Sequence, residues 1–160
     1  MHLPKTILVP TDFSTCAEQA VQYGLKLAKQ LDARAYLMTA WTMPYSRWDE
    51  QRESPHDVPP QLEAAAKAAL EARLLRARKD FEGVEALFYI GDTTDSILKA
   101  AADVEADIIV VGTHGRKGLA RMFEGSVTEA VTRRAVCPVL AIRYRVEEAS
   151  AVPARSGATR

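Results

Sequence analysis

Five short apolar runs are spaced along the chain, and longer amphipathic stretches separate them. Most of these runs are continuously apolar and do not alternate with polar residues, which is typical of parallel strands covered on both faces. The predicted strands are Thr6–Pro10, Ala35–Ala40, Val84–Ile90, Ile108–Gly112 and Val139–Arg143.

Between the runs, apolar residues recur at helical spacing. The four predicted helices carry Ala17, Ala20, Val21, Gly24, Leu25, Ala28 and Leu31; then Leu62, Ala66, Leu70, Leu74 and Phe81; then Ile97, Ala101 and Val104; and last Val127, Ala130, Val131 and Arg134. This alternation predicts an α/β fold: a single-domain, open, twisted, five-stranded parallel sheet. We expect it to be doubly wound and Rossmann-like, with strand order 3-2-1-4-5 and helices on both faces. Ligands of such sheets bind at the carboxyl ends of strands where the winding reverses, so Asp12 and Gly112 are expected to face one crevice.

Possible helix starts follow the capping-box spacing, in which a capping side chain precedes an acidic residue by three positions. The sequence predicts such starts at Thr15 with Glu18, at Asp92 with Asp95 and at Ser126 with Glu129.

Length and composition fit one globular domain. The chain has 160 residues, 48% of them hydrophobic, so it needs no disulfide or metal to hold its core. We expect the domain to span residues 1–146 and residues 147–160, which lack apolar periodicity, to form a disordered tail. Lys and Arg total 21 and so do Asp and Glu, a balance that argues against a sequence-independent nucleic-acid binder.

Cysteine usage and hydropathy bear on the compartment. Cys16 and Cys137 have no metal-ligand spacing, so we expect no metal site formed by protein side chains. No signal-peptide pattern and no apolar run of about 20 residues is present, so a cytoplasmic protein with reduced thiols and no membrane contact is expected. The polar segment Thr42–Pro60 is long for a link between a strand and a helix, and a functional flap and a plain surface loop both remain open.

A glycine-containing pattern follows the fourth predicted strand. The run Gly112-Thr113-His114-Gly115 is followed, after nine residues, by Gly125-Ser126 at the start of the last predicted helix. Glycines let backbone N–H groups approach a ligand closely, and a helix N-terminus adds unpaired donors and partial positive charge. Together these parts favour an anion such as phosphate. The pattern is neither a P-loop nor a dinucleotide fingerprint.

These residues carry a family resemblance. The stretch Val111–Leu119, with Gly125-Ser126-Val127, Cys137-Pro138-Val139-Leu140, Gly91-Asp92 and Ile7–Asp12, resembles the universal stress protein family, in its ATP-binding branch, over residues 4–144. The resemblance implies an adenine-nucleotide site at the ends of strands one and four. By position, Asp12 would hydrogen-bond the nucleoside; Pro10, Thr11 and Ala40 would line the adenine pocket; Gly112, Gly115, Gly125 and Ser126 would hold ribose and phosphates; and Thr113, His114, Arg116, Val127 and Thr128 would complete the binding set.

Structural readings of the same residues stay open. Ser126 or Asp12 could serve only to cap a helix, and the glycines could serve only turn geometry. His114 has no assignable nucleophile and carboxylate partners, so a catalytic triad is not supported.

Three functions follow from this reading. The first is an ATP-binding stress-response protein, with Mg²⁺ held through the phosphates, that acts as a nucleotide-dependent regulatory dimer. The resemblance implies a homodimer through the edge strand 139–143. The second is a nucleotide-free dimeric interaction module. The third, an adenylyl-transferring enzyme, lacks the S-G-G-x-D-S and H-x-G-H signatures, and we expect at most slow ATP hydrolysis.

Overall fold

The computed structural model describes residues 3–42, 60–113 and 127–143 of the chain. Within these ranges the backbone forms one five-stranded parallel sheet with the order β3-β2-β1-β4-β5. The strands are β1 (Thr6–Pro10), β2 (Arg34–Trp41), β3 (Val84–Ile90), β4 (Ile108–Thr113) and β5 (Val139–Arg143). The predicted strand order and parallel sense are confirmed, and only the ends of β2 and β4 extend by one residue beyond the predicted bounds.

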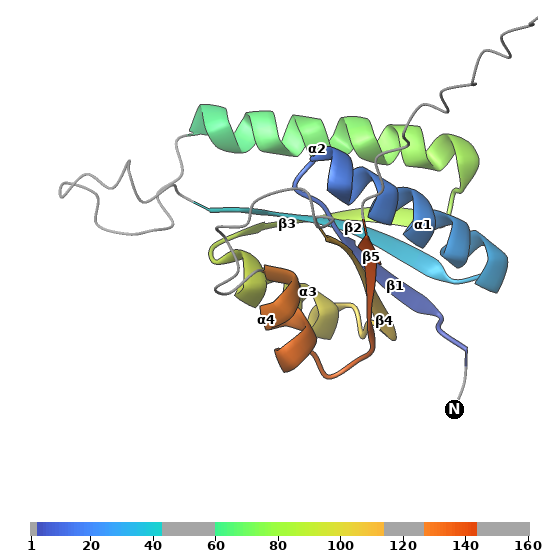
Figure 1. Cartoon of the computed structure of the whole chain (residues 1–160). Helices are drawn as coiled ribbons and strands as arrows, with labels where there is room; N and C mark the ends of the chain where they lie inside the picture. Colours follow the sequence, from blue (N-terminus) through green and yellow to red (C-terminus); the bar gives the residue numbers. More distant parts are fainter. Residues whose placement is uncertain (1–2, 43–59, 114–126, 144–160) are drawn as a thin grey trace, which may run out of the picture.

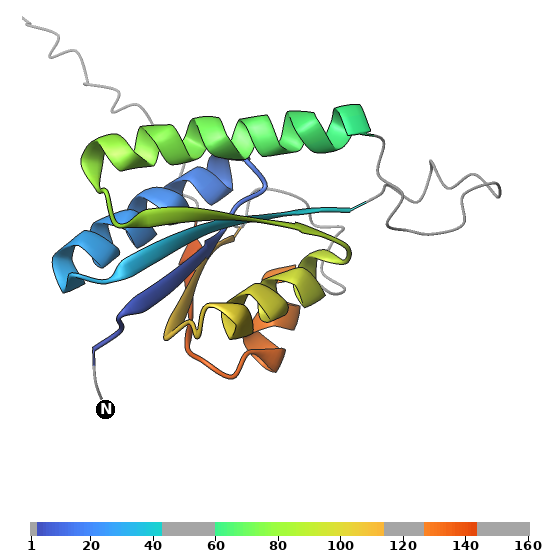
Figure 2. The ribbon, with the colours of Figure 1, turned by 180° about the vertical axis from the view of Figure 1, so that it is seen from behind.

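In the part of the chain that the structure describes, four helices cover the sheet: α1 (Thr15–Leu31), α2 (Pro60–Asp80), α3 (Thr93–Asp103) and α4 (Val127–Arg134). Figure 1 and Figure 2 show α1 and α2 on one face of the sheet and α3 and α4 on the other. On the first face α1 contacts β1, β2, β4 and β5, while α2 contacts β2 and β3. The predicted doubly wound arrangement is therefore confirmed.

The core is divided between these two faces. Side chains alternate across a strand, so Ile7 and Val9 of β1 pack under α1 and α2, whereas Leu8 packs under α3 and α4. All three side chains are fully buried, and each burial contributes about 1.5–3 kcal/mol relative to exposure. The central strand β1 is thus held from both sides, and its carboxyl end is a rigid place for a site.

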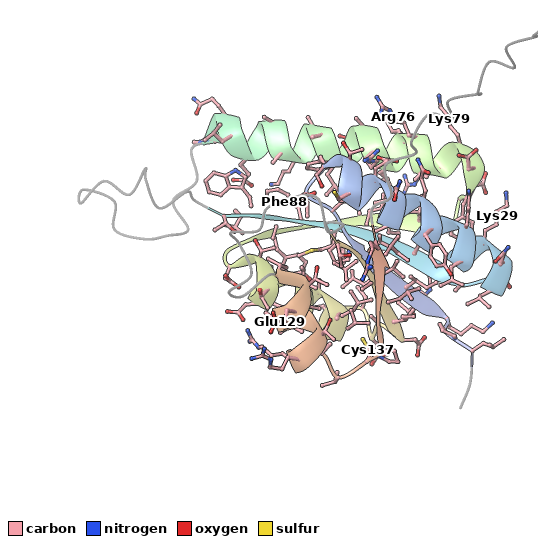
Figure 3. All side chains as sticks on the ribbon, in the orientation of Figure 1. Lys29, Arg76, Lys79, Phe88, Glu129 and Cys137 are labelled. Atoms are coloured by element: carbon pink, nitrogen blue, oxygen red, sulfur yellow. The ribbon has the colours of Figure 1, made fainter. Side chains whose placement is uncertain are left out.

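Helix α2 packs on the sheet through a narrow stripe of buried side chains. Leu70 and Ala77 are the buried residues of this helix. Figure 3 shows Phe88 of β3 between the sheet and α2, while Arg76 and Lys79 project away from the sheet. The ammonium of Lys67 lies 5.3 Å from the centre of the Phe88 ring, so a cation–π contact joins α2 to β3 beside these buried residues.

One predicted helix start is wrong. The N-cap of α1 is Ser14 and not Thr15: the Ser14 Oγ accepts a hydrogen bond from the Ala17 N–H at 3.2 Å. Ser14 keeps extended backbone angles while Thr15 is already helical, and the capping oxygen must come from the last non-helical residue. The predicted start of α3 is confirmed, because Asp92 accepts from the Asp95 N–H at 2.9 Å. Ser126 lies outside the described residues.

The carboxyl ends of all five strands lie at one edge of the sheet, as parallel strands require. The chain winds from β1 toward β3 in one direction and continues through β4 and β5 in the other, so the winding reverses between β1 and β4. Among the helices in the described ranges, none is both long and apolar enough to cross a membrane. Residues 43–59 of the predicted long loop and the predicted tail 147–160 lie outside the described residues.

Candidate functional site

The turn that follows β1 places the Asp12 side chain at the edge of the sheet where the winding reverses between β1 and β4. The Thr11 N–H donates to the Met38 carbonyl at 2.8 Å, which extends the pairing of β1 with β2 by one residue. Thr11 is buried, whereas Asp12 is exposed. The backbone is thus anchored to the sheet immediately before a carboxylate that faces solvent.

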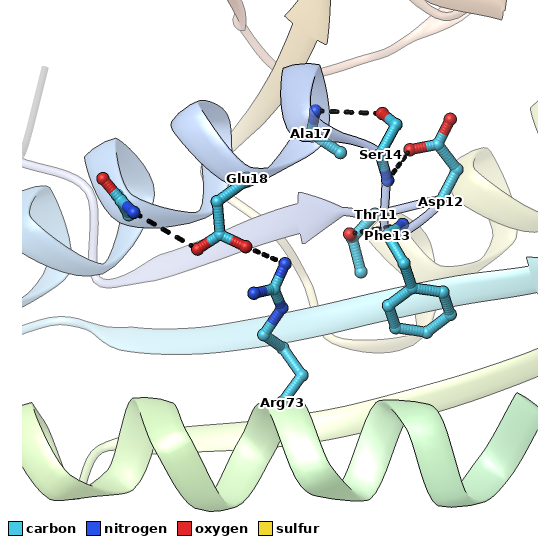
Figure 4. A network of polar contacts seen from close by, with 8 residues as sticks. Thr11, Asp12, Phe13, Ser14, Ala17, Glu18 and Arg73 are labelled. Carbon is cyan, nitrogen blue, oxygen red and sulfur yellow. Dashed lines mark hydrogen bonds and ion pairs between the residues drawn. The ribbon is translucent and has the colours of Figure 1, made fainter.

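Of the two roles that the sequence left open for Asp12, the structure bears on its support of the helix start, and its contact with a nucleoside stays a prediction. Its Oδ1 accepts a hydrogen bond from the Ser14 N–H at 2.9 Å, and Ser14 in turn caps α1 (Figure 4). Asp12 therefore supports the start of the helix indirectly. Within the described part of the chain its Oδ2 has no hydrogen-bond partner, so one oxygen of an exposed carboxylate is available to a ligand hydroxyl.

Pro10 and Ala40 lie at the carboxyl ends of β1 and β2. Pro10 is buried, and Ala40 is half-buried beside the core under α3 and α4. Both side chains are small and apolar, which suits the flat face of a base. The sheet therefore brings Pro10, Thr11, Asp12 and Ala40 to one edge, as predicted, while their contact with a nucleotide stays a prediction.

Gly112 near the end of β4 has a structural reason of its own. A Cβ built there would lie 2.7 Å from the Cys16 carbonyl oxygen and 3.0 Å from the Cys16 carbonyl carbon. Real Cβ atoms do not approach backbone so closely, so glycine is what lets the first turn of α1 pack against β4. The predicted contact of Gly112 with ribose or phosphate remains a prediction.

Two threonine hydroxyls at the end of β4 bond to the protein's own backbone. The Thr128 Oγ1 donates to the Gly112 carbonyl at 3.3 Å, and the Thr113 Oγ1 donates to the Ile142 carbonyl at 3.4 Å. Each hydroxyl has one hydrogen. In this arrangement Thr113 and Thr128 stabilise the junction of β4 with α4 and β5, and a phosphate would have to compete for their hydrogens.

The remaining predicted contacts are only partly described. Val127 is the first residue of α4, and its side chain is exposed. The other predicted site residues, His114, Gly115, Arg116, Gly125 and Ser126, lie outside the described residues. In the part of the chain that the structure describes, no three His, Cys, Asp or Glu side chains are grouped so that they could hold a metal ion.

Sequence reasoning missed an ion pair beside this turn. Glu18 in the first turn of α1 pairs with Arg73 of α2 and also accepts from the Gln22 side-chain amide at 3.3 Å (Figure 4). Burial, with Arg76 nearby, lowers the pKa of Arg73. The partners are 55 residues apart in sequence (73 − 18), so no local pattern pointed to the contact.

A second missed contact joins the ends of β2 and β3. The Thr42 Oγ1 donates to the Gly91 carbonyl at 2.7 Å and lies 3.2 Å from the Thr93 Oγ1. Gly91 has φ 138°, a conformation that favours glycine. The pair Gly91-Asp92 at a strand end was a visible signal for this turn, and it marks the boundary of the same edge of the sheet.

The chain resembles known proteins over nearly its whole length. Residues 4–143 match the Universal stress protein family. The Universal stress protein MJ0531 of Methanocaldococcus jannaschii is 31% identical over 164 residues, which cover 92% of this chain and 86% of that protein. The solved structure of MJ0577 from the same organism superposes with a TM-score of 0.67 at 26% identity, covering 89% of this chain and 97% of that one.

A crystal structure of a universal stress protein in complex with cAMP has a TM-score of 0.66 at 27% identity, and the match covers 88% of this chain and 97% of that one. The family match includes every strand and helix described above. The chain belongs to the universal stress protein family.

Proposed function

We propose that this protein binds an adenine nucleotide at the carboxyl ends of β1 and β4. In detail, we propose that the nucleotide is ATP, with Mg²⁺ held through its phosphates, as in the ATP-binding branch of the family. The bound state would control the shape or partners of a cytoplasmic homodimer. Support comes from the topology of the sheet, from the similar protein crystallised with cAMP and from the glycine pattern after β4.

The observation that carries the proposal is the exposed Asp12 carboxylate at the point where the winding reverses. A carboxylate at a strand end is a good acceptor for ribose hydroxyls in α/β nucleotide sites. Pro10 and Ala40 offer apolar contact to the base beside it. The residues present therefore fit the nucleoside half of the ligand, and residues 114–126 are the proposed phosphate-binding segment.

Calorimetric titration with ATP and Mg²⁺ tests the proposal. We expect saturable binding to the wild type and a loss of about tenfold or more in affinity for Asp12→Asn, because a hydrogen bond to a charged group is weakened. Asp32→Asn is the matched control. Asp32 is also an exposed aspartate at an end of α1, and its left-handed backbone (φ 52°) suits asparagine. A folded wild type that takes up no nucleotide contradicts the proposal.

A second candidate function, a dimeric interaction module without nucleotide, has its own observation. β5 ends one side of the sheet, and no described strand pairs with its outer edge. The Ile109 N–H donates to the Pro138 carbonyl, so we infer that Leu140 and Ile142 direct their backbone groups to β4 and that Ala141 directs its groups outward. An apolar strand with such an edge is suited to pair with a second copy.

The substitution Ala141→Pro tests the pairing. It removes an outward N–H while the bonds between β5 and β4 remain, since proline is tolerated on edge strands. Sedimentation should show a dimer for the wild type and a monomer for the variant. If a monomeric variant still binds ATP, nucleotide binding does not depend on the dimer. If ATP binding is lost together with the dimer, the two functions depend on each other. We expect no more than slow ATP hydrolysis in either case.

A further inference from the structure

The turn between β1 and α1 contains an unfavourable backbone conformation. Phe13 has φ 64°, in the left-handed region that side-chain-bearing residues seldom adopt. Two other described residues that are not glycine also have positive φ. Asp32 is the C-cap of α1 and Glu105 follows the C-cap of α3, and at the C-terminal end of a helix such a conformation is ordinary. Phe13 precedes a helix, so the usual reason does not apply to it.

Two hydrogen bonds, each from a backbone N–H to a side-chain oxygen, hold this conformation. The Phe13 N–H donates to the Thr11 Oγ1 at 3.1 Å, and the Ser14 N–H donates to the Asp12 Oδ1 at 2.9 Å. Thr11 is itself fixed, because the residue is only 6% exposed and its N–H donates to the Met38 carbonyl of β2. The buried hydroxyl is therefore a rigid acceptor that draws the Phe13 amide inward.

The direction of the Asp12 carboxylate follows from this geometry. Because the Ser14 N–H occupies Oδ1, rotation of the carboxylate is restricted, and Figure 4 shows the second oxygen turned away from the Ser14 amide. If Phe13 relaxed to negative φ, the Ser14 N–H would move relative to Asp12 and the carboxylate would lose this restraint. The strained residue thus determines where the exposed oxygen points.

We propose that Thr11 and Phe13 are positioning residues that hold the Asp12 carboxylate in advance for the ribose hydroxyls. This inference rests on the proposed nucleotide binding. A carboxylate that is already oriented binds a hydroxyl without the cost of ordering its side chain. Neither Thr11 nor Phe13 needs to touch the ribose for this effect.

The first test uses the protein without nucleotide. Amide hydrogen exchange at Phe13 and Ser14 is compared in the wild type, Thr11→Val and Thr11→Ser. Valine has nearly the same shape but no acceptor, so both amides should exchange faster, whereas serine keeps the acceptor and should restore protection. Equal exchange rates in the wild type and Thr11→Val overturn the inference.

The second test compares ATP with 2′,3′-dideoxy-ATP as titrants. In the wild type we expect ATP to bind about tenfold or more tighter, the usual range for a hydrogen bond to a charged group. In Thr11→Val this ratio should fall below about threefold, because the loss of the hydroxyl contact weakens the binding of ATP more than that of dideoxy-ATP. Thr11→Ser should recover the ratio. An equal loss for both nucleotides would mean a purely structural role and overturn the inference.

A second pair of variants guards against poor folding of Thr11→Val. Phe13→Asn keeps access to positive φ and should keep the ratio, whereas Phe13→Val resists that conformation and should lose it. The reverse order overturns the inference. A wild type that binds neither nucleotide removes the proposed function and this inference with it, while a wild type that binds both equally removes only the inference.

Discussion

The turns after β1 and β3 both lead from a strand into a helix at the same edge of the sheet, yet they use their aspartates differently. After β3, Asp92 caps α3 directly through the Asp95 N–H. After β1, Ser14 caps α1, and among the described residues Asp12 accepts a hydrogen bond from the Ser14 N–H alone. The longer turn transfers the capping role to serine, and this leaves a carboxylate oxygen for a ligand.

Each of the two turns contains a residue with positive φ, but the residue type differs. Glycine occupies the unusual conformation after β3 (Gly91, φ 138°), whereas phenylalanine occupies it after β1 (Phe13, φ 64°). Glycine adopts positive φ at little cost, while phenylalanine needs the support of neighbouring hydrogen bonds. The turn after β3 thus serves the fold, and the strained conformation of the turn after β1 agrees with its proposed role in ligand binding.

The largest expected effect concerns Gly91. Gly91→Ala places a side chain at φ 138°, and we expect the free energy of unfolding to fall by about 2 kcal/mol. Urea denaturation measures it. A change below about 0.5 kcal/mol would show that the turn relaxes freely and would remove the contrast between the two turns.

The capping residues should give the next largest effect. We expect Asp92→Ala and Ser14→Ala each to cost about 1 kcal/mol of stability, because each removes an N-cap acceptor. Asp12→Ala should cost only about 0.5 kcal/mol, since it removes a bond to an exposed turn. Denaturation of the three variants in parallel checks the order. A loss in Asp12→Ala as large as in Asp92→Ala would show that both aspartates are structural.

Ion pairs in the first turns of α1 and α3 extend the comparison. Glu18 pairs with Arg73 at side-chain exposures of 31% and 15%, whereas Asp95 pairs with Arg134 at 64% and 54%, with 2.7 Å between Oδ1 and Nη2. A double-mutant cycle should give about 0.7 kcal/mol for the first pair and about 0.3 kcal/mol for the second, because exposure and salt screen the surface pair more. Equal coupling energies would contradict this dependence on burial.

The smallest expected effect on stability concerns Tyr89 of β3 at alkaline pH. The Tyr89 hydroxyl donates to the Asp103 Oδ2 at 2.7 Å, and burial together with this carboxylate raises the pKa of Tyr89 to about 12. The pKa of a tyrosine in an unfolded chain is about 10. The raised pKa therefore adds stability that is present below pH ~10 and is lost as pH rises toward ~12.

Tyr89→Phe should be slightly less stable than the wild type at pH ~9, and the difference should shrink as pH rises from ~10 toward ~12. Denaturation at several pH values measures this, and the other tyrosines cancel in the comparison. A constant difference over that interval would contradict the assignment.

Much of the fold could be predicted because its signals are local. Apolar runs, most of them continuous, predicted the five strands of the described residues, and the helical spacing predicted their four helices. Asp92 was found because its capping distance lies within four residues. Ser14 was missed because Thr15, its neighbour, matched the same pattern with Glu18, and only the backbone angles distinguish the two.

The details of the site were less accessible to sequence reasoning. Asp12 could be selected from its place after a strand, but the strain at Phe13 and the anchoring of Thr11 to β2 depend on distant backbone. The Glu18–Arg73 pair depends on how α2 is laid over the sheet. Such contacts are set by tertiary packing, which leaves no periodic trace in the sequence.

The close seating of α1 on Gly112 affects how mutations of this glycine should be interpreted. Any larger residue would collide with the Cys16 peptide and push the beginning of α1 outward. Since that helix starts three residues after Asp12, its displacement would also move the carboxylate that we propose binds the nucleoside. A Gly112 variant that no longer retains nucleotide would therefore report a dislodged helix, whether or not the glycine itself ever meets the ligand.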